Sequence, residues 1–159
     1  MKTILEPVKI NEKPILVDLL DKYLFEMLGE KTEYKYLDSY WEKSDRHPFF
    51  IKKGDRIVGF VLVNPHTVIE TDAKSIAEFY IKKEHRRTGI GKNAAFKIFD
   101  MFPGKWEIRE LKENKLAHSF WKDIICEYTK GEYIDKMIDD DRWSGPVQIF
   151  CNLRSKKAD

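Results

Sequence analysis

A short basic segment with two glycines, residues 86–92, separates two regular patterns and reads Arg-Arg-Thr-Gly-Ile-Gly-Lys. Apolar and polar side chains alternate before it, over residues 75–82, as in a strand. From Ile90, within this segment, to residue 101, apolar residues recur at helical spacing. Glycines between a strand and a helix allow a sharp turn in which consecutive N–H groups converge. The pattern predicts an α/β fold with an anion-binding loop at a helix N-terminus.

Hydrophobic periodicity and turn residues divide the rest of the chain into further elements. We expect other strands at residues 4–10, 49–52, 57–63, 106–111, 133–137 and 147–153. We expect other helices at residues 15–28, 34–41 and 114–125. On the last helix, one apolar face should pack on the sheet through Leu116, Ala117, Phe120, Trp121 and Ile124. The order β-α-α-β-β-β-α-β-α-β-β predicts a mixed central sheet with helices on both faces and a parallel pair in the second half.

Length and composition favour one globular domain. The chain has 159 residues, of which 42% are hydrophobic, enough for one core and too few for two ordinary domains. We therefore expect a single domain over residues 1–153 and a charged tail at residues 154–159. The net charge of +2 indicates no general surface for nucleic acid or for an anionic membrane.

Cysteines and histidines indicate neither a metal site nor a disulfide framework. Cys126 and Cys151 match no metal spacing, and the four histidines share none. We therefore treat the histidines as surface or turn residues. Residues 1–10 contain no apolar stretch that could act as a signal peptide or cross a bilayer. These features predict a cytoplasmic protein without a metal, and they leave a homodimer open.

Two motifs carry a resemblance to a known family. Arg86-x-x-Gly89-x-Gly91 is similar to the pyrophosphate-binding signature of GNAT acetyltransferases, which also lies between a strand and a helix. Residues 114–121, Asn-Lys-Leu-Ala-His-Ser-Phe-Trp, resemble that family's Asn-x-x-Ala-x-x-Phe-Tyr segment. The resemblance covers nearly the whole chain in element order. It implies a GNAT-like sheet and an N-acetyltransferase that uses acetyl-CoA and a small-molecule amine.

The resemblance also implies roles for particular residues. The loop amides would hold the pyrophosphate, and the pantetheine arm would pair with the edge of the preceding strand. A backbone amide near Ile81 would stabilise the oxyanion. Arg86, Arg87 or Lys92 would bind the remaining CoA phosphates. The implied CoA-binding residues are Phe79, Tyr80, Ile81, Arg86, Arg87, Thr88, Gly89, Ile90, Gly91, Lys92, Asn114, Ala117, Phe120 and Trp121.

Glu78 is the candidate general base. A carboxylate in the middle of this strand would face the cleft beside the thioester if it alternates with Phe79, and alternation puts Glu78 and Tyr80 on one face. An exposed or salt-bridged strand glutamate is the alternative, in which case water or His118 would carry the proton. Aromatic residues of segment 34–41 lie where family members build the acceptor wall, although a core patch would give the same pattern.

Trp121 departs from the family, many of whose members have a tyrosine there that protonates the CoA sulfur. An indole donates a hydrogen bond but does not give up a proton at useful pH. Either the thiolate leaves with hydrogen-bond help alone, or Tyr128 or Tyr80 substitutes, or Trp121 simply packs in the core. The departure leaves a second function open, a GNAT-like domain that binds CoA as a sensor or has lost catalysis.

A dinucleotide-binding fingerprint is a further alternative, because Gly89-x-Gly91-x-x-Ala94 is followed by Glu110 about twenty residues on. In that fold the glycines follow the first strand almost at once. Here several strands and helices precede them, and too little chain follows for a second half of the sheet. These positions disfavour the alternative.

Overall fold

The computed structural model describes residues 2–153, and the expected charged tail, residues 154–159, lies outside them. The described chain falls into two compact units. The first unit contains the chain up to Asn64 together with Ala77–Ala94. The second contains Pro65–Ile76 and the chain from Ala95 onward. Strand β4 and helix α3 each pass from one unit into the other.

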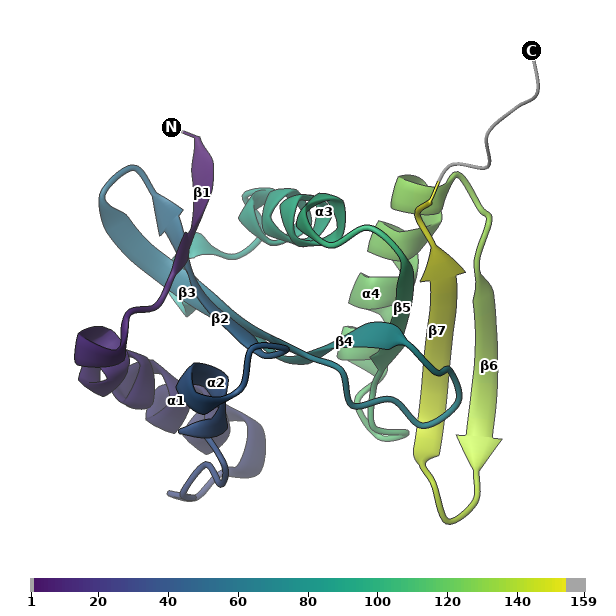
Figure 1. Ribbon diagram of the computed structural model, residues 1–159, viewed down its shortest axis with the longest axis horizontal. Helices are drawn as coiled ribbons and strands as arrows, with labels where there is room; N and C mark the ends of the chain where they lie inside the picture. The colour runs from purple at the N-terminus through teal and green to yellow at the C-terminus, as the bar shows by residue number, and fades with distance from the viewer. Residues whose placement is uncertain (1, 154–159) are drawn as a thin grey trace. The chain divides into compact units, whose positions relative to one another are not determined.

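Strands and helices follow one another in the predicted order (Figure 1). The strands are β1 Thr3–Pro7, β2 His47–Lys53, β3 Arg56–Asn64, β4 Ala73–Ile81, β5 Lys105–Arg109, β6 Ile134–Asp139 and β7 Ser144–Cys151. The helices are α1 Lys13–Leu28, α2 Ser39–Glu42, α3 Ile90–Met101 and α4 Lys115–Thr129, with 3-10 turns η1 Ile10–Glu12 and η2 Lys83–His85. The bounds of α3 agree with the prediction, because Gly89 and the Pro103-Gly104 pair mark both ends locally.

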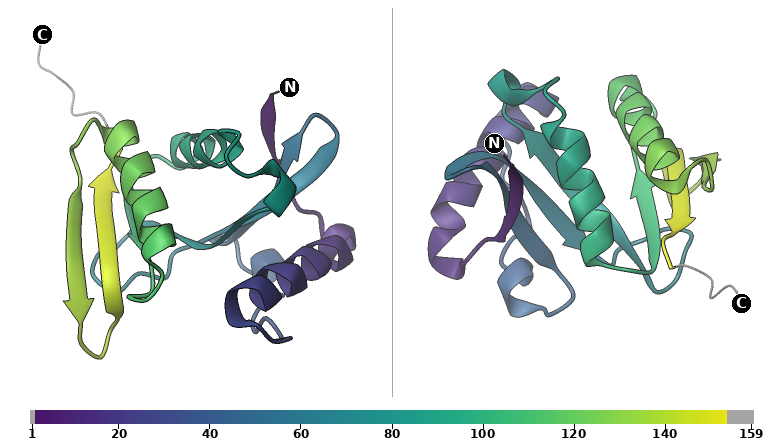
Figure 2. Two further views of the ribbon diagram at one scale, coloured as in Figure 1. Left: turned by 180° about the vertical axis from the view of Figure 1, so that it is seen from behind. Right: turned by 90° about the horizontal axis from the view of Figure 1, so that it is seen from above.

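The first unit contains strands in the order β1-β2-β3-β4, with β1–β2 and β2–β3 antiparallel. Helices α1 and α2 lie beside these strands (Figure 2). The buried side chains of α1 recur three to four residues apart and give the helix one apolar stripe. The core of this unit consists of Val8, Leu16, Leu19, Leu20, Leu37, Tyr40, Phe50, Phe60, Leu62 and Tyr80.

The second unit contains strands in the order β4-β5-β7-β6. Strand β5 is parallel to β4, with Ala73 opposite Lys105, and antiparallel to β7. The parallel pair is where the sequence predicts it. The seven strands form a mixed sheet, so the predicted α/β fold class is confirmed. Because at least four of the described strand pairs are antiparallel, the mostly parallel, doubly wound sheet that a dinucleotide-binding fold requires is excluded.

The predicted helix over residues 34–41 is wrong in its first half. Tyr36 has a φ of 66°, in the left-handed region, and a residue in that conformation cannot continue a right-handed helix. Helix α2 is therefore a single turn, Ser39–Glu42. The hydroxyl of Ser39 donates to the Tyr36 carbonyl at 2.6 Å and fixes the turn before the helix.

The predicted apolar face of α4 is also wrong in part. Leu116 is 87% exposed and Phe120 is 39% exposed, whereas Trp121, Ile124 and Ile125 are buried. At about 100° per residue, the nine residues from Leu116 to Ile125 make about two and a half turns, so Leu116 lies opposite Ile125. The buried stripe is therefore narrower than predicted and rotated away from Leu116.

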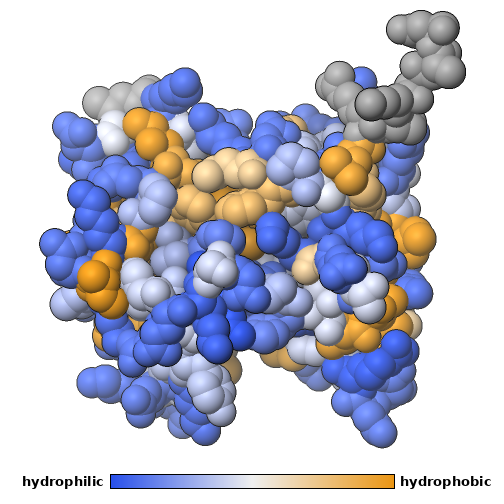
Figure 3. Space-filling view, in the orientation of Figure 1, coloured by the Kyte–Doolittle hydropathy of each residue, from blue (hydrophilic) through white to orange (hydrophobic). Residues whose placement is uncertain are grey.

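The described surface is mostly hydrophilic on the face drawn in Figure 3, where hydrophobic side chains form one band across the upper middle and several smaller groups. Large exposed apolar residues include Phe25 and Leu28 at the end of α1 and Met137 on β6. Within residues 2–153, no helix is long and apolar enough to span a bilayer.

Gly59 in β3 constrains the first unit. A Cβ atom there would lie 2.0 Å from the Tyr80 carbonyl oxygen in β4, and backbone cannot move aside as a flexible side chain can. We predict that Gly59→Ala lowers the free energy of unfolding by ~3 kcal/mol or more, at or above the usual cost of overpacking. Denaturant titration measures the loss.

Gly29→Ala is the matched control for this change. Gly29 ends α1 at a φ of 74°, yet a Cβ atom there would meet nothing within 4 Å. The control should therefore lose only ~1 kcal/mol, through backbone strain. Equal losses in the two variants would contradict the close approach of β3 and β4.

Candidate active site

The loop predicted to bind phosphate joins β4 to α3 in the first unit. After η2, Lys83–His85, the backbone turns at Arg87 and Gly89, whose φ values are 61° and 86°. The hydroxyl of Thr88 donates to the His85 carbonyl at 2.7 Å and fixes the turn. A left-handed arginine costs about 1–2 kcal/mol. Backbone strain of this kind is concentrated at functional loops.

The N-terminus of α3 follows the loop directly. The Asn93 N–H donates to the Gly89 carbonyl at 3.0 Å and closes the first helical turn. The N–H groups of Ile90 and Gly91 precede that bond and have no acceptor within the helix. A Cβ atom at Gly89 would meet nothing within 4 Å, so the backbone is approachable there. This arrangement suits an anion.

Arg86, the first residue of the motif, is held within the first unit. Its Nη1 and Nη2 donate to the two carboxylate oxygens of Glu26 in α1 at 2.5 and 3.0 Å. Its Nε donates to the Ile81 carbonyl at 2.8 Å, and its guanidinium lies 5.6 Å from the centre of the Tyr80 ring. Hydrogen bonding from Arg86 holds the pKa of Glu26 below its usual value.

Glu78 lies half-buried in β4 among phenols. The Tyr23 hydroxyl of α1 donates to Glu78 Oε2 at 2.5 Å. Burial raises the pKa of Glu78 to about 7, against the opposing effect of hydrogen bonds from Tyr23 and Tyr34. Burial and the nearby carboxylate raise the pKa of Tyr23, so this phenol remains a proton donor. Glu78 is therefore bound by phenols, in contrast to the salt-bridged alternative.

The two strand residues Glu78 and Tyr80 lie on one face, as predicted. Tyr23 contacts both, through its hydrogen bond to Glu78 and through a ring contact with Tyr80 at 5.7 Å. Within segment 34–41, Tyr36 is 83% exposed. The other three aromatic residues are part of the same core, with Tyr40 buried and Tyr34 and Trp41 half-buried against it. They therefore serve as core residues, and Tyr34 additionally contacts Glu78.

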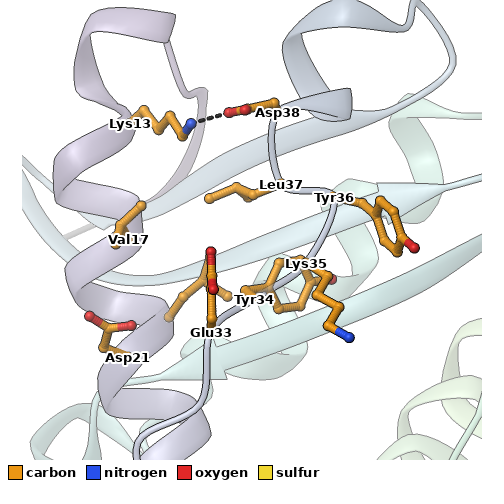
Figure 4. Close-up of a pocket in the computed structure, with 10 residues that line it drawn as sticks. Lys13, Val17, Asp21, Glu33, Tyr34, Lys35, Tyr36, Leu37 and Asp38 are labelled. Atoms are coloured by element: carbon orange, nitrogen blue, oxygen red, sulfur yellow. Dashed lines mark hydrogen bonds and ion pairs between the residues drawn. The ribbon is translucent and has the colours of Figure 1, made fainter.

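A pocket of about 300 Å³ lies beside this group, between α1 and residues 33–38 (Figure 4). Its apolar walls include Val17 and Leu37, and an ion pair between Lys13 and Asp38 spans one end. Tyr34 lines the pocket and also hydrogen-bonds Glu78. The phenol of Tyr34 thus joins the pocket to the carboxylate.

Strand β4 carries three residues predicted to contact the cofactor. Phe79 is half-buried, whereas Tyr80 and Ile81 are buried. Among the described residues, the ladder between β4 and β5 covers only Ala73 and Lys74. The later part of β4, along which the resemblance puts pantetheine, is not in this ladder.

The second motif lies in the second unit, at the start of α4. Asn114 caps the helix, because its Oδ1 accepts the Ala117 N–H at 3.1 Å. Phe120 is partly exposed, and Trp121 is buried with its ring 6.4 Å from that of Phe99. The packing interpretation of Trp121 is therefore supported. This motif and the glycine loop belong to different units.

His118 corrects the expectation that the histidines are surface or turn residues. It is half-buried in α4, and its Nε2 lies 3.2 Å from Asp135 Oδ2 in β6. Gln148 also donates to Asp135, at 2.9 Å, and Lys122 lies 3.6 Å from it. No local pattern reveals this polar group, because its members are distant in sequence. Nearby, burial raises the pKa of Glu110 to about 8.

Comparisons with known proteins agree on one family. A family model described as the acetyltransferase (GNAT) family matches residues 14–124, and no curated protein matches significantly. An acetyltransferase from Thermus thermophilus is 16% identical with a TM-score of 0.72, over 95% of this chain and 97% of that one. Aminoglycoside acetyltransferase AAC(6')-Ib in complex with coenzyme A is 12% identical with a TM-score of 0.70, over 95% of each chain. Spermidine N-acetyltransferase from Vibrio cholerae, in complex with CoA and spermine, is 10% identical with a TM-score of 0.62. The match covers 94% of this chain and 95% of that one. These likenesses show the fold.

The raised pKa of Glu78 predicts a pH-dependent effect on stability. Between pH 4.5, the usual pKa of a glutamate, and about pH 7, the folded state still binds the Glu78 proton, whereas the unfolded state has largely lost it. The stability that this proton contributes is present below 4.5 and is lost as pH rises through about 7. Glu78→Gln cannot ionise, so it should exceed the wild type in free energy of unfolding by ~1–3 kcal/mol at about pH 8.

Urea titrations of both proteins at about pH 5 and about pH 8 measure this difference. At the lower pH the advantage of Glu78→Gln should be small, because the wild-type carboxyl is then mostly protonated. An advantage that does not change between the two pH values would show that Glu78 is not held at a raised pKa.

Proposed function

Because the chain belongs to the acetyltransferase (GNAT) family, we propose that it transfers an acetyl group from acetyl-CoA to an amine of a small molecule. The observation that carries this proposal is the half-buried carboxylate of Glu78, which Tyr23 hydrogen-bonds at 2.5 Å. Glu78 lies on the strand that leads into the glycine loop. A proton acceptor and a candidate anion site thus occur in one segment of the chain.

Acetyl-CoA would supply the acetyl group as a thioester, activated toward an amine. The loop fits its pyrophosphate, because backbone amides over residues 87–92 meet the N-terminus of α3 and Gly89 leaves the backbone approachable. The basic residues Arg87 and Lys92 would add charge for the remaining phosphates. Phe79 to Ile81 would orient the pantetheine arm, and the segment that begins at Asn114 would contact it.

Glu78 would take the proton of the amine. An alkylamine with a pKa of ~10.4 is almost entirely ammonium at about pH 7, so exposing its lone pair costs about 4–5 kcal/mol. With a pKa of about 7, Glu78 is ionised in a large fraction of molecules at neutral pH and is still basic enough to accept a proton. The donors Tyr23 and Tyr34 would keep its carboxylate oriented.

Departure of the CoA thiolate would need less catalytic assistance than deprotonation of the amine. A backbone N–H near Ile81 would stabilise negative charge that develops on the acetyl oxygen. A thiolate with a pKa of about 8.5 leaves into neutral water at a cost of only ~2 kcal/mol. Burial raises the pKa of Tyr80, and burial raises that of Tyr128 to about 12. We therefore favour departure of the thiolate without a protein acid.

The pocket beside Tyr34 supports a cationic acceptor. Its lining carries one net negative charge, from three carboxylates and two lysines: Asp21, Glu33, Asp38, Lys13 and Lys35. Tyr34 joins the pocket to Glu78. Two similar structures are acetyltransferases named for spermidine and for aminoglycosides, which are small amines. We propose that the acceptor is a small cationic amine that enters beside α1.

Trp121 favours a second candidate function. Its indole is buried against Phe99 and cannot act as the acid that tyrosine provides in many relatives. A domain that binds CoA without turnover, as a sensor, would need no such acid.

We also propose that residues 1–153 form a single domain. We propose a cytoplasmic location, since Cys126 and Cys151 are both free thiols.

The glycine loop yields a prediction on cofactor binding. Acetyl-CoA at about 100 times its Kd should raise the Tm of the wild type by roughly 5 °C or more. Gly89→Val should abolish this rise, because a side chain there blocks the approach of phosphate to the backbone. Thermal unfolding with and without acetyl-CoA measures the shift.

Gly131→Val is the matched control for the loop variant. Gly131 has a φ of 84° and, like Gly89 at 86°, nothing within 4 Å of a Cβ atom. Both variants should therefore lose similar stability without ligand, and only Gly131→Val should keep the shift. A full shift in folded Gly89→Val would remove the loop from the binding site.

The base assignment yields a prediction on turnover. Glu78→Gln keeps the size of the side chain and loses its basicity, so turnover at neutral pH should fall by about 10- to 1000-fold. Affinity for acetyl-CoA should change little, because the arm would contact backbone. Thiol release is followed with the amine that reacts fastest in a panel.

The pH dependence of the same rates completes this test. The wild-type rate should fall toward low pH as Glu78 takes up a proton, and Glu78→Gln should lack that limb. An unaltered rate and profile in the variant would assign Glu78 a structural role only.

A further inference from the structure

Helix α1 contacts two functionally important residues of the first unit from one face. Tyr23 and Glu26 lie three positions apart and therefore project from the same side of the helix. Tyr23 donates to Glu78 at 2.5 Å, and Glu26 accepts from Arg86 at 2.5 and 3.0 Å. One helical turn thus holds both the candidate base and the first residue of the glycine motif.

Three N–H groups of the Arg86 side chain already donate to acceptors within the protein. Two of its nitrogens bind Glu26 in a bidentate pair, and its third binds the Ile81 carbonyl at 2.8 Å. Its guanidinium also stacks on Tyr80, whose ring contacts that of Tyr23 at 5.7 Å. Two of its five N–H groups, one on Nη1 and one on Nη2, are not used in these bonds, so a phosphate bound there would share Arg86 with the negative charge of Glu26.

The C-terminal part of α1 has little apolar packing to hold it. Its buried residues end at Leu24, and the apolar residues beyond are exposed: Phe25 by 60%, Met27 by 42% and Leu28 by 50%. Apolar packing therefore does not fix the last turn of the helix. Tyr23 packs against the core through its ring, and the polar contact of the turn beyond it is the pair of Glu26 with Arg86.

We propose that Arg86 and Glu26 form an anchor that holds the end of α1 in place, so that Tyr23 stays on the Glu78 carboxylate. Arg86 is then a positioning residue for the base and not a ligand of the CoA phosphates. This inference rests on the proposed acetyl transfer with Glu78 as its base.

Loss of the anchor has a defined effect on the base. When Tyr23 leaves Glu78, the carboxylate loses a hydrogen bond that favours its charged form, and its pKa rises. Among the described residues, the other titratable groups shown to act on it are the phenols of Tyr34 and Tyr40, with Arg46 acting on Tyr40. None of these replaces the donor that is lost. The fraction of Glu78 able to accept a proton at neutral pH therefore falls.

Glu26→Gln tests the anchor at a half-exposed position where folding should survive. We expect kcat at neutral pH to fall about 3- to 30-fold and the acidic limb of the rate profile to move up by roughly one pH unit. The KM for acetyl-CoA should stay within about twofold of the wild type, since a positioning residue acts on kcat. Tyr23→Phe should move the limb in the same direction.

Variants of Arg86 separate an anchor from a phosphate ligand. Arg86→Lys keeps the charge but loses the bidentate fork, so it should behave like Glu26→Gln. Adding Glu26→Gln to Arg86→Lys should then have little further effect, because both remove the same contact. The proposal would be overturned if Arg86→Gln raised the KM for acetyl-CoA roughly tenfold or more while Glu26→Gln left this KM unchanged. Arg86 would then be a phosphate ligand.

Asp18→Asn is the matched control on α1. Asp18 pairs with Lys22 at 3.4 Å on the same helix, and both side chains are more than half exposed. Its loss should leave kcat and the limb unchanged. A limb shift equal to that of Glu26→Gln would show that any ion pair of the helix has this effect, which contradicts a specific anchor.

Glu78→Gln distinguishes failure of this inference from failure of the proposed function. If Glu78→Gln keeps the limb, Glu78 is not the base and the anchor proposal fails with it. If Glu78→Gln removes the limb while Glu26→Gln leaves it in place, the base assignment stands and the anchor alone is wrong.

Discussion

The proposed chemistry depends on a carboxylate held among phenols. Burial alone would keep Glu78 protonated well above its usual range, and an acid protonated at neutral pH cannot accept a proton from an amine. Hydrogen bonds from Tyr23 and Tyr34 oppose burial and leave the pKa at about 7. The two opposing effects together give Glu78 a pKa that suits the proposed base at neutral pH, which neither burial nor the phenols would give alone.

Backbone geometry then decides where this base lies. Gly59 allows β3 to approach the Tyr80 carbonyl of β4 more closely than any other residue would. That approach fixes the part of β4 that carries Glu78 and Tyr80. Beyond the strand, the left-handed turns at Arg87 and Gly89 bring the chain into α3, whose first amides have no acceptor within the helix. Strand, loop and helix start thus form one local arrangement, consistent with the resemblance of this segment to the family motif.

The parts of the structure that could be predicted are those that local patterns determine. Alternation in β4 and glycines before and after α3 are visible within a few residues, so these elements were predicted well. The helix at residues 34–41 was predicted too long, because aromatic spacing does not reveal the left-handed Tyr36. The face of α4 was misplaced because apolar residues such as Leu116 can be exposed at a helix start.

Polar contacts between residues distant in the sequence cannot be predicted from local sequence patterns. Tyr23 and Glu78 are 55 residues apart, and Glu26 and Arg86 are 60 residues apart. No periodicity relates such positions, so the motif offers Arg86 as a phosphate ligand and gives no sign of its partner in α1. His118 and Asp135 were missed for the same reason. Single-sequence patterns indicate which residues can do chemistry, whereas the fold determines which side chains hold them.

The most direct test compares two titrations of the same protein. The pH dependence of kcat/KM reports the ionisation of the free enzyme, and ¹³C NMR of carboxyl-labelled glutamate reports Glu78 itself, assigned by its loss in Glu78→Gln. We predict that both midpoints coincide near a pH of about 7, the value expected for Glu78. A Glu78 resonance that titrates more than about one unit from the kinetic midpoint, or a rate without an acidic limb, would contradict the assignment of Glu78 as the base of acetyl transfer.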